Sequence, residues 1–166
     1  MATPNDVKEL SEVFARLGAR DPESWASSQV AEGIEQLHRF VFLRQAWARI
    51  LADKDTGWIA ARIKQAKADP RAPYAGVGLA LARCTDMGVD PQDLTDIVRG
   101  MQVELLFSLC YMLEDPGFAE GEVEDIGWSL VVADENCQPT ARQINGLHES
   151  VLETDPTGRE MRPRDA

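Results

Sequence analysis

Hydrophobic residues near the start of the chain recur at the spacing of an amphipathic helix. An apolar side chain occurs every three or four positions in this stretch: Val7, Leu10, Phe14 and Leu17. One face of an α-helix repeats every 3.6 residues, and glycine commonly follows a helix end. The pattern therefore predicts a helix that ends near Gly18.

The same periodicity returns after the pair Asp21-Pro22, which is typical of a new helix start. It runs to about residue 51, and Gly33 divides it into two pieces. A basic helix is predicted next, over residues 58–67, before two prolines at 70 and 73 break the chain. Residues 74–87 then form a helix rich in small side chains, which allow close approach of another helix.

The clearest helix start in the chain is Asp90-Pro91, where an acidic cap precedes a proline at the first helical position. A continuous apolar stripe follows and stops at residues 114–116; its members are Leu94, Ile97, Val98, Met101, Leu105, Leu109 and Met112. The stripe predicts that the helix over residues 91–114 is the central core helix.

From residue 116 onward the composition changes to an acidic loop and then to strand-forming residues. Residues 126–144 predict a small β-hairpin, and the last residues, 155–166, predict a loosely ordered tail. We therefore expect one mainly α domain over residues 1–154, built as a bundle of about five helices with a small C-terminal β-hairpin.

The net charge of the chain and its distribution limit the classes of binding partner that we expect. The net charge is −11, and it is uneven: residues 1–84 carry 12 basic and 10 acidic groups, whereas residues 85–166 carry 5 and 18. Nucleic-acid binding depends on Lys and Arg that neutralise phosphates, so this balance argues against DNA or RNA. An acidic second half instead favours a protein partner with a basic surface.

The location predicted from the sequence is cytoplasmic. Three cysteines without a paired motif suit a reducing compartment, with Cys84 and Cys110 as small apolar side chains and Cys137 in a turn-like stretch. The first residues have the pattern of neither a signal nor a transit peptide, and the most apolar stretch is too short to span a bilayer. No membrane contact is expected.

Six carboxylates lie within the twelve residues from 114 to 125, and Trp128 follows them directly. Their spacing does not match a calcium-binding loop, so no metal site is predicted. Exposed tryptophan beside charge is typical of an interface. The predicted partner-binding residues are Glu120, Glu122, Glu124, Asp125 and Trp128.

The sequence contains few candidates for catalytic residues. The chain has only two histidines, and His148 and Glu104 are the weak candidates for catalysis: Glu104 lies within the apolar run, on a strip that also fits the solvated side of the helix. A pocket beside the 91–114 helix would use Glu104, Tyr111, Arg142 and His148. The pair Gly76 and Gly78 lacks the third glycine of a dinucleotide-binding motif, so no cofactor is predicted.

Three functions remain open. The first is a non-enzymatic acidic interaction factor, with an inhibitor, immunity-like or adaptor role, that binds a basic protein surface. The second is a small-molecule-binding protein or small enzyme with a pocket between the 91–114 helix and the C-terminal segment. The third is an oligomeric structural module, because the small-residue helix suits close self-association.

Overall fold

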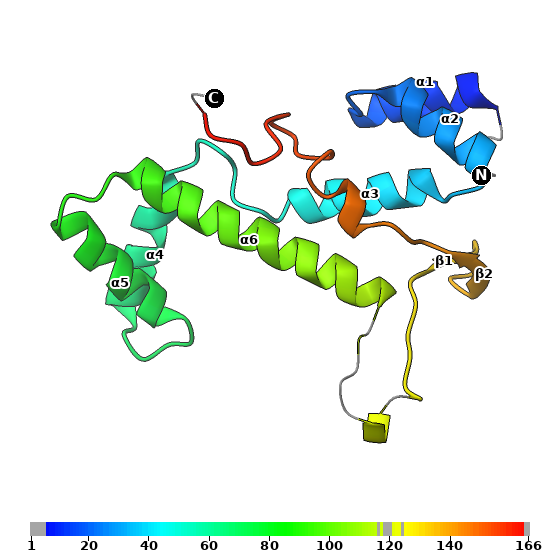
Figure 1. The fold of residues 1–166 in the computed structure, drawn as a ribbon. Coiled ribbons are helices and arrows are strands. Elements are labelled where there is room, and N and C mark those ends of the chain that lie inside the picture. Colours follow the sequence, from blue (N-terminus) through cyan, green and yellow to red (C-terminus); the bar gives the residue numbers. More distant parts are fainter. Residues whose placement is uncertain (1–5, 116, 118–120, 124, 165–166) are drawn as a thin grey trace. The chain divides into compact units, whose positions relative to one another are not determined.

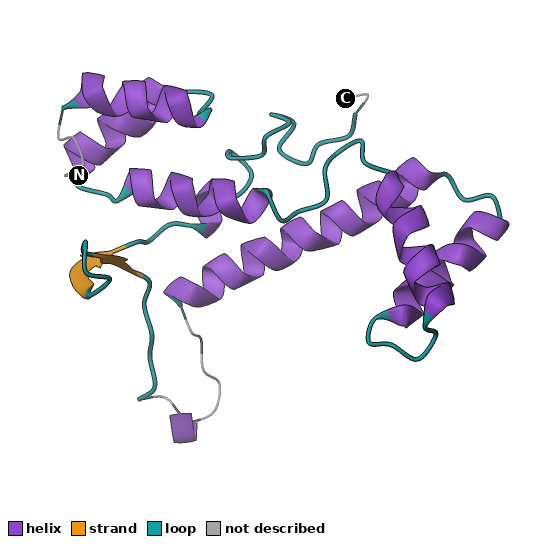
Figure 2. Cartoon of the chain, turned by 180° about the vertical axis from the view of Figure 1, so that it is seen from behind, coloured by secondary structure: helices purple, strands orange, loops and turns teal. Residues whose placement is uncertain are grey.

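The computed structural model describes residues 6–115, 117, 121–123 and 125–164. The chain is 57% helical and carries a two-stranded antiparallel hairpin near its C-terminus, so the predicted fold class is confirmed (Figure 2). The chain divides into two compact units, Met1–Arg49 with Glu104–Ala166, and Ile50–Val103. The single domain expected over residues 1–154 stays a prediction. Among the described residues, no helix combines the length and apolarity needed to cross a membrane.

The first unit begins with a helical pair, α1 (Val7–Leu17) and α2 (Pro22–Glu32), which pack against each other (Figure 1). Asp6 caps α1 by accepting hydrogen bonds from the N–H groups of Lys8 and Glu9 at 2.9 and 3.2 Å. Asp21 caps α2 by accepting from the Ser24 N–H at 3.0 Å. These carboxylates satisfy N–H groups that have no partner within the helix.

An aromatic core joins this pair to the third helix, α3 (Gln36–Trp47). The rings of Phe14, Trp25 and Phe40 lie 5.3 to 5.9 Å apart, and the two pairs that involve Phe40 meet edge to face. Leu10 and Phe14 have no exposed surface. Edge-to-face aromatic packing and complete apolar burial stabilise this part of the unit.

The C-terminal part of the first unit contains the hairpin. Strands β1 (Val131–Ala133) and β2 (Pro139–Gln143) pair with Val131 opposite Gln143, and are shorter than the predicted 126–144 span. Two short 3-10 helices flank them, η1 (Gly121–Val123) and η2 (His148–Ser150). The turn between the strands holds Cys137 at φ +61°, a conformation that few side chains adopt.

Residues 155–164 follow η2 and make specific contacts. Asp155 is buried and accepts hydrogen bonds from the Thr157 N–H, the Thr157 hydroxyl and the Met161 N–H. Arg20 donates to the carbonyl of Gly158 at 3.1 Å. These contacts hold residues 155–164 against the turn between α1 and α2. The sequence predicts a loosely ordered tail for this segment.

The second unit pairs α4 (Gly57–Ala68) with α5 (Ala75–Asp86). Gly78 of α5 lies directly against α4: a Cβ atom at this position would collide with the carbonyl oxygen of Arg62 and lie 2.6 Å from the Ala66 Cβ. The helix predicted over residues 74–87, which is rich in small side chains, therefore uses Gly78 for a close contact with α4 of the same chain.

Polar side chains fix the connection that precedes α4. On helix α6 (Pro91–Glu114), Arg99 is buried and donates to the Leu51 carbonyl at 2.6 Å. Gln102 accepts from the Leu51 N–H at 2.8 Å, and the Thr95 hydroxyl donates to the Asp55 carbonyl at 3.0 Å. Side chains of α6 thus supply hydrogen-bond partners to main-chain groups of residues 51–55, which lie outside the helices and strands.

The buried face of α6 is not the one that the apolar stripe predicted. Its buried positions are Thr95, Arg99, Val103 and Cys110, whereas five members of the stripe are exposed: Ile97, Met101, Leu105, Leu109 and Met112. The prediction of a central core helix buried along this stripe is therefore wrong. The physical reason is that Thr95 and Arg99 bind the main chain of residues 51–55, so the strip that holds them faces inward.

Candidate interaction site

An exposed apolar row lies on the C-terminal half of α6, within the first unit. Three side chains at helical spacing form it, and Trp128 adjoins its end because the indole N–H donates to the Met112 carbonyl at 2.8 Å. The exposed fractions are 59% for Leu105, 44% for Leu109, 43% for Met112 and 41% for Trp128. We refer to these four residues as the α6–Trp128 surface.

Exposed acidic groups precede Trp128 in the sequence. Asp115 accepts a weak hydrogen bond from the Tyr111 hydroxyl at 3.5 Å, just beyond the end of α6. Glu122 lies in η1, and Asp125 precedes Trp128 by three residues. Of the predicted partner-binding residues, Glu120 and Glu124 lie outside the described residues. Glu122, Asp125 and Trp128 are all exposed, as a contact surface requires.

His148 lies at the start of η2 and faces the end of α6. Its Nδ1 lies 3.3 Å from the Glu114 carboxylate, and the other Glu114 oxygen accepts from the Leu147 N–H at 2.5 Å. The rings of Tyr111 and Phe107 meet the imidazole edge to face at 5.1 and 5.7 Å. This cluster attaches η2 to α6, because each of its contacts joins the two elements.

The structure brings together only two of the four predicted pocket residues, Tyr111 and His148. Glu104 is exposed on α6, as expected for the solvated side of the helix. Arg142 binds both carboxylate oxygens of Glu35 at 2.5 and 2.6 Å, and this pairing raises the pKa of Arg142. Arg142 is therefore engaged in a two-pronged ion pair at the base of α3.

Arg39 is a buried residue that sequence reasoning did not single out. Its guanidinium donates to the Asn145 carbonyl at 2.8 Å and to the Ser150 hydroxyl at 3.3 Å, and lies 3.9 Å from Glu149. Burial lowers the pKa of Arg39, while the charges of Glu149 and Glu114 raise it. Nothing in the sequence marks it, since its partners are more than a hundred residues away.

The α6–Trp128 surface was only partly visible in the sequence. Trp128 was identified from its position after the carboxylates, whereas Leu105, Leu109 and Met112 were assigned to the core. The signal that the sequence offered was the polar strip beside them, because the side chains of Thr95, Arg99 and Gln102 can bind the main chain of a loop. They do so only when this side of the helix faces inward.

The three cysteines differ in exposure, which gives a direct prediction. Cys110 is buried on α6, and its pKa is raised to about 11 by burial and then by the Glu114 charge. Cys137 is exposed. At pH 8 we expect a thiol reagent to modify Cys137 quickly and Cys110 only after unfolding, because the thiolate is the reactive form.

Mass spectrometry of the labelled protein, with and without denaturant, measures this order. A Cys137→Ser variant is the matched control, since it removes the exposed site and leaves Cys84, of intermediate exposure, and the buried Cys110. Rapid modification of Cys110 in the folded protein would contradict its burial.

Comparisons of this chain with protein-family models, curated proteins and solved structures found no match.

Proposed function

We propose that this protein is a non-enzymatic interaction factor that binds a basic protein surface through the α6–Trp128 surface. The observation that carries the proposal is the exposure of an apolar row on α6 together with a tryptophan beside its end. Soluble proteins rarely leave a large contiguous apolar patch uncovered, and such patches are commonly contact sites.

The chemistry of the four side chains supports a protein partner. Tryptophan is enriched among residues that dominate binding energy, and methionine and leucine provide adaptable apolar area. Complete burial of one such side chain is worth about 1.5 to 3 kcal/mol. Covering Leu105, Leu109, Met112 and Trp128 therefore offers enough free energy to offset part of the cost of association.

Charge supports the basic character of the partner. The chain carries a net charge of −11, and Asp115, Glu122 and Asp125 are exposed close to Trp128 in the sequence. A negative rim around an apolar contact accelerates association with a basic surface and disfavours acidic competitors. Such a contribution weakens as salt screens the charges.

We expect the triple variant E120K/E122K/E124K to bind the partner at least about tenfold more weakly at low salt, since each reversal replaces an attraction by a repulsion. The melting temperature should change little, because Glu122 is exposed and charge changes at exposed positions have small effects on stability. Quantitative affinity capture from native extract, at low and at moderate salt, measures the effect.

The matched control is a charge reversal of equal size elsewhere in the chain, E9K/E12K/E23K, on the exposed sides of α1 and α2. This control variant should retain the partner. Equal loss of binding in both variants would mean that only the net charge of the protein matters. Unchanged binding in E120K/E122K/E124K would contradict a contribution of these acidic residues to partner binding.

A further inference from the structure

Helix α3 carries apolar side chains on two faces, and the first unit buries only one of them. The buried positions of this helix are Gln36, Arg39, Phe40, Leu43 and Trp47. Three further apolar side chains, Val41, Phe42 and Ala46, are only partly buried. A helix that is apolar all round is normally covered on every side. The second face of α3 therefore has apolar area to offer to a ligand.

A groove of about 440 Å³ follows this second face, and we call it the α3 groove. It extends over about three helical turns, from His38 to Arg49, which lies just beyond the end of the helix. Ile144, which follows strand β2 and is 8% exposed, adds a wall from another part of the same unit. The volume lies within the range of ligand pockets, and mainly apolar walls are typical of them.

The charged group at the end of this groove is a cation. Arg49 is exposed, and its guanidinium donates to the Gln45 carbonyl at 2.7 Å, which holds it at the groove wall. No carboxylate of the described residues lines the groove or pairs with Arg49. A guanidinium has five N–H donors, and its planar shape matches a carboxylate. The donors that Gln45 leaves unused are therefore available to an anion.

The opposite end of the α3 groove is electrostatically balanced. His38 Nδ1 lies 3.1 Å from the Glu35 carboxylate. Both oxygens of that carboxylate also accept from the Arg142 guanidinium. The nearest acidic group is thus already paired, and the net charge along the groove comes from Arg49.

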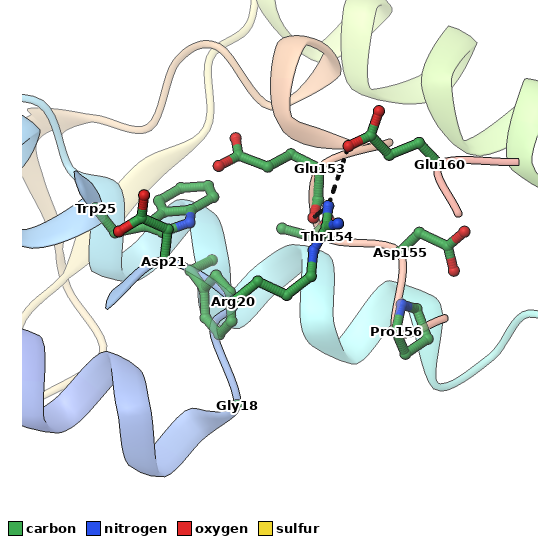
Figure 3. A pocket seen from close by; sticks show the side chains of 10 residues that line it. Gly18, Arg20, Asp21, Trp25, Glu153, Thr154, Asp155, Pro156 and Glu160 are labelled. Carbon is green, nitrogen blue, oxygen red and sulfur yellow. Dashed lines mark hydrogen bonds and ion pairs between the residues drawn. The ribbon is translucent and has the colours of Figure 1, made fainter. Parts of the chain in front are cut away.

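A cavity at the turn between α1 and α2 has the opposite character (Figure 3). Its walls include three carboxylates, those of Asp21, Glu153 and Glu160, and its arginine, Arg20, pairs with Glu160 at 3.2 Å. An anion that entered this cavity would meet like charges and an engaged arginine. Of these two concave sites in the first unit, the α3 groove is the one that suits an anion.

We propose that the α3 groove binds a small amphiphilic carboxylate, that is, an apolar chain that ends in a carboxylate group. The carboxylate pairs with the Arg49 guanidinium, and the chain covers Val41, Phe42 and Ile144. Charge complementarity selects the anion, and the apolar walls select the chain. This inference goes beyond the proposed function, because the groove shares no residue with the α6–Trp128 surface and needs no protein partner.

Three probes separate the two requirements in calorimetric titrations of the whole protein at low salt. Octanoate has both the chain and the charge, 1-octanol has the chain alone, and acetate has the charge alone. We expect octanoate to bind at least about fivefold more tightly than 1-octanol, and acetate not to bind measurably. Equal affinity for 1-octanol would overturn the role of Arg49, and equal affinity for acetate would overturn the role of the apolar walls.

The Arg49→Gln variant should lose at least about fivefold in affinity for octanoate, since it keeps a polar side chain and removes the charge. Arg49 is exposed, so the melting temperature should change little. Arg44→Gln is the matched control, because Arg44 is an exposed arginine of the same helix outside the groove, and this variant should bind normally. Unchanged affinity in Arg49→Gln, or no binding to the wild-type protein, would overturn the proposal.

Two measurements locate the ligand and test for a different occupant. The methyl resonances of Val41 and Ile144 should shift on addition of octanoate, and shifts confined to other methyl groups would contradict the site. Analytical ultracentrifugation should show no self-association that depends on the groove. A wild-type dimer that dissociates in a Val41→Glu variant would mean that a second copy covers the groove, and would overturn a small-molecule ligand.

Discussion

Replacing Arg39 with methionine is expected to lower the free energy of unfolding by about 3 kcal/mol. The side chain is buried on α3 and donates to the Asn145 carbonyl and the Ser150 hydroxyl. Methionine fills much of the same space but removes the donor of both hydrogen bonds, of which the one to Ser150 is buried. Urea unfolding, followed by circular dichroism, measures the loss.

The backbone at Gly146 lies close against the Arg39 guanidinium. Gly146 has φ +71°, and a side chain at this position would overlap the Arg39 guanidinium. Arg44→Met is the matched control, because Arg44 is exposed on the same helix and should change the free energy of unfolding by about 0.5 kcal/mol or less. Similar losses in both variants would contradict the role assigned to Arg39.

The Gly78→Ala variant is the second large effect, with an expected loss of about 2 kcal/mol. Alanine favours a helix over glycine by about 1 kcal/mol, so the intrinsic effect has the opposite sign. A Cβ at position 78, however, collides with the Arg62 carbonyl and lies 2.6 Å from the Ala66 Cβ. Because the obstacle is helix backbone, α4 and α5 must move apart.

Gly100→Ala is the control for this prediction. Gly100 also lies inside a helix, but apart from its chain neighbours and the backbone of its own helix no atom lies within 4 Å of the position where its Cβ would stand. This change should therefore stabilise the protein by about 0.5 to 1 kcal/mol through helix propensity. Thermal unfolding of the two variants should show shifts of opposite sign, and a stabilised Gly78→Ala would contradict the close packing of α4 and α5.

Local signals predicted the helices well. The Asp21-Pro22 and Asp90-Pro91 pairs mark the starts of α2 and α6, and Gly18 adopts φ +88° where α1 ends. The hairpin was also predicted, although its strands are shorter than residues 126–144 suggested. These features depend on interactions within a few residues, which a sequence shows directly.

The orientation of α6 and the partners of Arg39 could not be predicted in the same way. Hydrophobic periodicity identified an apolar face, but the inward side was decided by Thr95 and Arg99, which bind main-chain groups some 40 to 50 residues earlier. Arg39 likewise binds Asn145, 106 residues away. A periodic pattern contains no information about such distant partners.

The central claim is that the α6–Trp128 surface contacts a protein partner, and site-specific photocrosslinking in the native cell tests it most directly. Benzoylphenylalanine at position 109 would report from the surface, and the same group at position 152 is the control, because Leu152 is 41% exposed elsewhere in the first unit. We predict one discrete adduct with a basic protein from position 109 and none from position 152. No adduct from position 109, or the same adducts from both positions, would contradict the claim.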